Sequence, residues 1–107
     1  MSNQPPKHFT KFTEKYPEIA KAYYALGDAV HGAGPLDEKT RAFIKIALSG
    51  GAKTQGAFHS HVRKARQLGI SFEEIRHVVL IALPTIGFPN MMALMSWIDD
   101  VERKEQE

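Results

Sequence analysis

A chain of 107 residues with 43% hydrophobic and 24% charged residues can close one small core, which excludes wholesale disorder and a second large domain. The formal net charge of +2 lacks the strong basic excess of a dedicated nucleic-acid binder. The sequence contains no cysteine, so a disulfide, a thiolate nucleophile and a Cys-ligated metal are all excluded.

Residues 1–16 are expected to form a polar lead-in followed by a short helix. The first six residues, MSNQPP, are polar, and Phe9, Phe12 and Tyr16 then fall on one helical face. The segment has no apolar signal core, and no run of the sequence approaches the roughly 20 apolar residues that cross a membrane. We therefore expect a cytoplasmic protein with no membrane partner.

Residues 17–102 are expected to form a single helical domain. Pro17 can open a helix as its first residue, and apolar side chains continue at helical spacing up to the Gly-rich break HGAGP at 31–35. Asp37 is a good N-cap for the next helix, which should run to about Ser49.

The second half of this domain should contain three more helices. The first should stop before Gly69, a residue typical of the position just beyond a helix C-terminus. Ser71 and Glu74 have the spacing of a capping box, which opens the next helix. That helix contains the almost wholly apolar segment VVLIAL at 78–83, and Pro84 is expected to kink or end it.

The last helix contains several methionines and the single tryptophan. Met91, Met92, Met95 and Trp97 are expected to form a subunit interface, because the last two helices hold more apolar surface than a chain of this length easily buries. Residues 103–107 should be a solvated tail. No segment alternates as a half-buried strand does, so the predicted fold class is all-α, with five or six helices.

The stretch RKARQLGISFEEIR at 63–76 has the form of a DNA-reading helix-turn-helix. However, Glu73 and Glu74 stand near the N-terminus of the second helix, where they would repel phosphate, and that helix then becomes apolar. A capping box and a glycine stop explain the same letters as an ordinary helical hairpin. We therefore expect no nucleic-acid partner.

The pair His59 and His61 invites a metal-binding interpretation, which helical geometry argues against. Positions two apart on a helix lie about 200° apart around the axis, so both rings cannot bind one ion. The helical spacing of Phe58, Val62 and Ala65 indicates that the segment is a helix. No metal is expected.

The histidines lead to separate predictions. His59 shares the polar face with Arg63 and should be solvated. His61 lies at the edge of the apolar stripe, so it is either a hydrogen-bonded core residue or the best acid–base candidate in the chain. His77 falls opposite the apolar stripe of its helix and should face solvent or a neighbouring subunit.

Three blocks in order, LDEKTRAFIKIAL, HVRKARQLGISFEEI and GFP before an apolar helix, resemble the carboxymuconolactone decarboxylase family, which includes the alkylhydroperoxidase-D-like proteins. The resemblance runs from about Leu36 to about Leu94. It implies an alkylhydroperoxidase-D-like helical bundle whose protomers assemble into closed rings, commonly trimers or hexamers. The expected partner is therefore the chain itself.

The peroxidase-like branch of that family has a Cys-x-x-Cys pair seven and four residues before its active-site histidine, which His61 matches. The matching positions here are Thr54 and Ala57, and the Glu of that branch's proton relay corresponds to Ala42. Because thiol–disulfide exchange needs a thiolate, the resemblance implies a member without peroxidase activity.

The decarboxylase branch also lacks the cysteines and keeps the histidine, which implies loss of CO2 from a small carboxylated lactone with proton transfer by His61. Where that branch often has Glu, Glu and Tyr, this chain has Ala57, His77 and Thr85. His77 is the second candidate for a polar group at the site.

Two hypotheses remain open. One is a decarboxylase-like enzyme that acts on a small organic acid without a cofactor, and the other is a catalytically silent oligomeric scaffold or small-ligand binding protein of the same fold.

Overall fold

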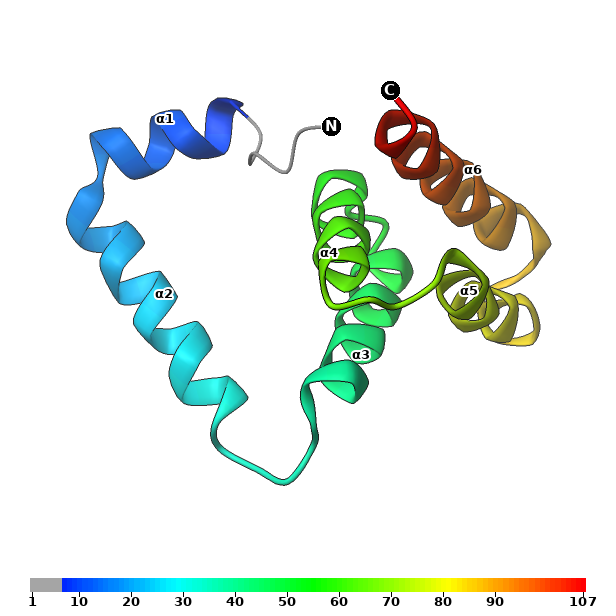
Figure 1. Cartoon of the computed structure of the whole chain (residues 1–107), viewed down its shortest axis with the longest axis horizontal. Coiled ribbons are helices and arrows are strands. Elements are labelled where there is room, and N and C mark those ends of the chain that lie inside the picture. The colour runs from blue at the N-terminus through cyan, green and yellow to red at the C-terminus, as the bar shows by residue number, and fades with distance from the viewer. Residues whose placement is uncertain (1–6) are drawn as a thin grey trace. The chain divides into compact units, whose positions relative to one another are not determined.

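The computed structural model describes residues 7–107, which form six α-helices (Figure 1). These are α1 (Lys7–Lys15), α2 (Pro17–His31), α3 (Glu38–Gly51), α4 (Gln55–Gln67), α5 (Phe72–Ile86) and α6 (Phe88–Glu105). No strand occurs within residues 7–107, so the all-α prediction is confirmed. The polar lead-in expected at residues 1–6 lies outside the described residues.

The helices belong to two compact units, which divide after Leu36. One unit contains α1 and α2, and the other contains α3 to α6. From the sequence, we expect residues 1–16 to be separate from a helical domain at residues 17–102, which puts a boundary between α1 and α2. These two helices nevertheless pack against each other, so they are described together.

Local capping signals account for the helix ends in the larger unit. The Asp37 carboxylate accepts a hydrogen bond from the backbone N–H of Thr40 at 2.8 Å, which opens α3. Ser71 and Glu74 form the expected capping box at the start of α5. Gly69, at φ +87°, adopts the left-handed conformation that glycine tolerates just after a helix.

The core of the larger unit lies between α3, α4, α5 and α6. The helix α3 packs against α4 and α5, and α6 packs against the same two helices. The most deeply buried large side chains are Phe58, Ile46, Ile75, Ile98, Val62 and Val79. Burying each such side chain stabilises the fold by about 1.5–3 kcal/mol, so this cluster is the main source of stability for α3–α6.

Arginine side chains hold the ends of α4, α5 and α6 together around Phe72. Arg66 donates to the Glu105 carboxylate at 3.0 Å, and its guanidinium lies 4.2 Å from the centre of the Phe72 ring. Arg76 pairs with Asp99 and Glu102 at 2.8 and 2.7 Å. Because α6 continues to Glu105, part of the segment expected as a solvated tail is helical and ion-paired.

The structure contradicts the expected interface on the last helix at one of its four residues, Met91. Met91 is 4% exposed and belongs to the core, and Met95 and Trp97 pack partly against that core. Met92 is 48% exposed. Pro84 lies within α5, which continues to Ile86.

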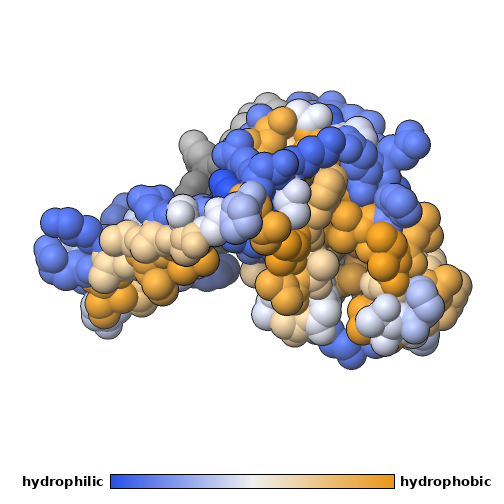
Figure 2. Space-filling view, turned by 90° about the horizontal axis from the view of Figure 1, so that it is seen from below, coloured by the Kyte–Doolittle hydropathy of each residue, from blue (hydrophilic) through white to orange (hydrophobic). Residues whose placement is uncertain are grey.

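Both units nevertheless have large apolar side chains on their surfaces, which Figure 2 shows over α1–α2 at the left and over the larger unit at the right. In the larger unit, Leu48, Leu80 and Ile81 are at least half exposed. In the smaller unit, the only buried residue among those described is Ala20.

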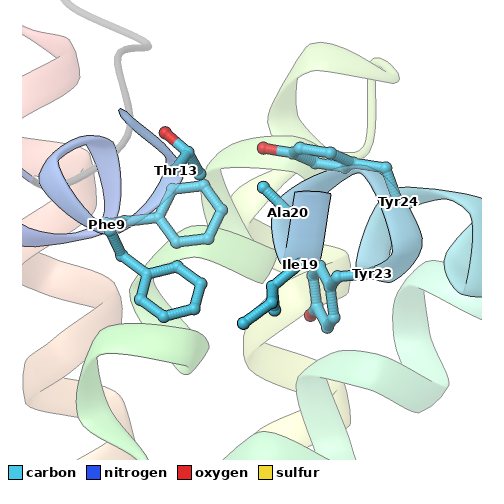
Figure 3. A pocket seen from close by; sticks show the side chains of 7 residues that line it. Phe9, Thr13, Ile19, Ala20, Tyr23 and Tyr24 are labelled. Carbon is cyan, nitrogen blue, oxygen red and sulfur yellow. The ribbon is translucent and has the colours of Figure 1, made fainter. Parts of the chain in front are cut away.

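Side chains of α1 and α2 line an apolar hollow of about 270 Å³ (Figure 3). Phe9 and Tyr24 meet edge to face across it at 6.5 Å. The remaining lining residues are Phe12, Thr13, Ile19, Ala20 and Tyr23.

Close packing at Gly50 gives the first testable prediction. An added Cβ would lie 2.9 Å from Leu94 Cδ1 and 3.1 Å from Phe58 Cε1, in a packed core. Overpacking costs about 1–3 kcal/mol, and the better helix propensity of alanine offsets about 1 kcal/mol of it. We expect Gly50→Ala to lower the free energy of unfolding by about 1 kcal/mol in urea titrations followed by circular dichroism.

Gly51→Ala is the matched control, because a Cβ at Gly51 would have no neighbour within 4 Å. It should leave the stability unchanged or raise it by up to about 1 kcal/mol. Equal effects of the two substitutions would contradict this account of the helix packing.

Candidate functional site

The buried side of α4 determines where its two central histidines lie. Phe58, Val62 and Ala65 are 0% exposed and face the core. His61 and His59, which flank this stripe, are both half-buried. Because they lie about 200° apart around the helix axis, they have different neighbours.

His61 lies in a positively charged environment near α3. Burial, followed by the charges of Lys64 and Lys45, lowers the pKa of its imidazole from 6.5 to about 4. Burial, Lys64 and Arg41 in turn lower the pKa of Lys45. The ring forms no hydrogen bond to the residues that the structure describes, so the expectation of a hydrogen-bonded core histidine is not met there.

This arrangement suits an uncharged base beside an anion. At neutral pH the His61 imidazole is neutral, because its pKa of about 4 lies well below the pH of the solution. Lys45 and Lys64 are both close enough to oppose its protonation, and the same field attracts a carboxylate. A bound anion would weaken that field and raise the pKa of His61.

The prediction that His59 is solvated is wrong. Its side chain is only 19% exposed, and its ring lies edge-on to Trp97 at 6.4 Å between ring centres. The buried Nε2 atom lies 3.4 Å from Asp100 Oδ2 but forms no hydrogen bond. The sequence placed this residue on the polar face of α4, and that face is covered by α6 in the fold.

His77 is exposed on α5, in agreement with its position opposite the apolar stripe. It lines a wide, open hollow of about 660 Å³ together with residues of α5 and α6, including Glu73, Leu80 and Glu102. His61 is not among the residues that line this hollow. The hollow beside His77 is therefore not formed by both candidate histidines.

The positions that match reactive residues of the family's branches hold no reactive group in this chain. The Thr54 hydroxyl donates to the Ser49 carbonyl at 2.9 Å, which closes the turn between α3 and α4. Ala57 is exposed, and Ala42 packs partly against the core. The Thr85 hydroxyl donates within its own helix to the Ile81 carbonyl at 3.3 Å.

Other binding chemistries have little support in the described residues. Within residues 7–107, no group of three His, Asp or Glu side chains is arranged to hold a metal ion. Two arginines of the helix-turn-helix-like stretch, Arg66 and Arg76, are paired with carboxylates of α6. None of the helices described is both long and apolar enough to cross a membrane.

Sequence comparison decides the family. Residues 17–100 match the carboxymuconolactone decarboxylase family over most of the chain. The chain belongs to this family. The resemblance seen in the three sequence blocks is thereby confirmed, for a member that has no cysteine.

Two proteins of similar sequence and one of similar structure accompany this family member. It is 31% identical over 87 residues to an uncharacterized protein of Methanocaldococcus jannaschii, covering 80% of this chain and 84% of that one. A Haemophilus influenzae protein, also uncharacterized, is 32% identical over 59 residues, covering 55% of this chain and 52% of that one. The crystal structure of an apo carboxymuconolactone decarboxylase family protein from Legionella pneumophila superposes with a TM-score of 0.77, at 25% identity over 90% of this chain and 86% of that one.

The low pKa of His61 predicts how stability depends on pH. In the unfolded chain His61 has a pKa near 6.5, so between about pH 6.5 and pH 4 the unfolded state binds more protons than the folded state. Stability should therefore fall as the pH drops through this window. In urea titrations at several pH values, we expect the free energy of unfolding of His61→Gln to fall less than that of the wild type between about pH 6.5 and pH 4.

Lys64→Gln tests the cause of this effect. Removing one neighbouring cation should bring the pKa of His61 closer to 6.5 and give an intermediate slope. Identical slopes for the wild type and His61→Gln would contradict the placement of His61.

Proposed function

We propose that this member of the carboxymuconolactone decarboxylase family binds a small organic acid beside His61 and uses the imidazole for proton transfer. The observation behind the proposal is a half-buried, neutral imidazole whose pKa is lowered to about 4 by burial and, to a smaller extent, by the charges of Lys64 on α4 and Lys45 on α3. Lys45 and Lys64 would attract the carboxylate, and His61 would exchange the proton. No cofactor is needed for this chemistry.

In the proposed reaction, His61 first takes up a proton and then donates it to the substrate. The bound carboxylate would offset the charges of Lys45 and Lys64, which raises the pKa of His61 and lets it take up one H+ from the solution. The C–C bond to the carboxylate then breaks, CO2 leaves, and the electron pair stays on the ring carbon. His61 donates its proton to that carbon and returns to the neutral form.

A second candidate is a catalytically silent oligomeric scaffold or small-ligand binding protein. This candidate is favoured because the chain has unreactive residues at three positions where the family's branches often have reactive or charged groups. Ala42, Ala57 and Thr85 cannot act as acids or bases near neutral pH. In this case His61 would contribute only to ligand binding.

Under both candidates we propose a homo-oligomer, a trimer or hexamer in line with the family resemblance. Its support is the apolar surface, which includes Tyr23 at 63% exposure in the smaller unit and Leu48 at 67% in the larger one. Large exposed apolar surface is typical of protein–protein interaction sites.

CO2 release separates the two candidates. With carboxymuconolactone as substrate, the wild type should release CO2, and His61→Gln should lower kcat by about 100-fold or more, as expected for loss of a general acid–base group. His8→Gln, a substitution of an exposed histidine on α1, should leave the rate unchanged. Binding of the lactone without CO2 release would favour the second candidate. If the lactone does not bind and no CO2 is released, the proposal is contradicted for this ligand.

The assembly is tested by light scattering. At micromolar concentration we expect a mass of three or six chains of 12.0 kDa, and a mass of 12.0 kDa would contradict the proposal. Ile81→Lys, at an apolar side chain that is 59% exposed on α5, should reduce the assembled mass. Glu73→Lys, at an exposed charged position on the same helix, is the control.

A further inference from the structure

The contact between α4 and α6 contains a buried polar atom without a hydrogen bond. His59 Nε2 has no partner within hydrogen-bond geometry even though Asp100 Oδ2 lies 3.4 Å away, and the His59 ring lies edge-on to Trp97. A buried imidazole nitrogen without a hydrogen bond destabilises the fold, because its desolvation is not compensated. We therefore ask which change in the protein would give His59 Nε2 a hydrogen bond.

The charges around His59 come from both helices. Asp100 on α6 favours a protonated ring, whereas Arg63 on α4 and Lys104 on α6 oppose it. Asp100 has one further cationic partner, Arg103, at 3.3 Å. Burial outweighs the attraction of Asp100, so the pKa of His59 is lowered and the ring is neutral at neutral pH.

We propose that His59 and Asp100 form a pH-sensitive contact between α4 and α6, separate from the His61 site. On acidification, His59 takes one proton from solvent, and the resulting imidazolium donates a charge-assisted hydrogen bond from Nε2 to Asp100 Oδ2. Such bonds are about 2.7–2.9 Å long, so the present separation of 3.4 Å must shorten. The contact between the helices becomes tighter while the buried charge makes the fold as a whole less stable.

Trp97 is placed to report this change. It is the single tryptophan of the chain, and the centre of its ring lies 5.7 Å from that of Phe58 and 6.4 Å from that of His59. A positive charge that appears beside the indole changes its fluorescence. A proton taken up at His59 is therefore visible without any label and without a ligand.

The test is a pH titration of Trp97 fluorescence in the full chain, with the His59 ring followed by NMR in the same range. We expect a reversible transition with a midpoint below pH 6.5 that coincides in both measurements. The transition should be absent in His59→Gln and retained in His61→Gln. Asp100→Asn should lower the midpoint by about one pH unit, because it removes the carboxylate that favours the charged ring.

Three results would overturn the proposal. These are a His59 midpoint at or above 6.5, a Trp97 transition that persists in His59→Gln, and an unchanged midpoint in Asp100→Asn. If His59→Gln does not fold, as judged by circular dichroism at pH 7, the NMR titration of the wild type and the Asp100→Asn shift decide the question.

Discussion

Phe58, Val62 and Ala65 are completely buried along one side of α4, and their burial determines the direction of every other side chain on that helix. Truncating a buried phenylalanine costs about 3–5 kcal/mol, which far exceeds any single polar contact on α4. The rotation of α4 about its axis is therefore set by the core. That rotation places His59 against α6 and His61 near Lys45 of α3 and Lys64 of α4.

The two histidines show how similar burial combined with different charges produces different chemistry. Burial is the largest influence on both, and it lowers both pKa values. At His59 a carboxylate works against burial, whereas at His61 two lysines add to it. His61 is therefore neutral at neutral pH, and at His59 the carboxylate offsets part of the effect of burial.

The helices and their ends could be predicted from sequence because their causes are local. Asp37, Ser71 with Glu74, and Gly69 each act within one turn of the chain, and the structure confirms all of them. The surroundings of His59 could not be predicted, because Asp100 approaches it from another helix. Hydrophobic periodicity gives the buried side of one helix and says nothing of a second helix that covers the polar side. The partial burial of Met95 and Trp97 was missed for the same reason.

The most direct test of the account is the pKa of His61, measured by NMR with and without carboxymuconolactone. The account predicts a value of about 4 for the protein alone and a rise toward neutrality when the lactone is added, with one proton taken up. A His61 pKa near 6.5 in the protein alone, or one that does not change with bound lactone, would contradict the central claim that this histidine is a proton-transfer group in an anion site.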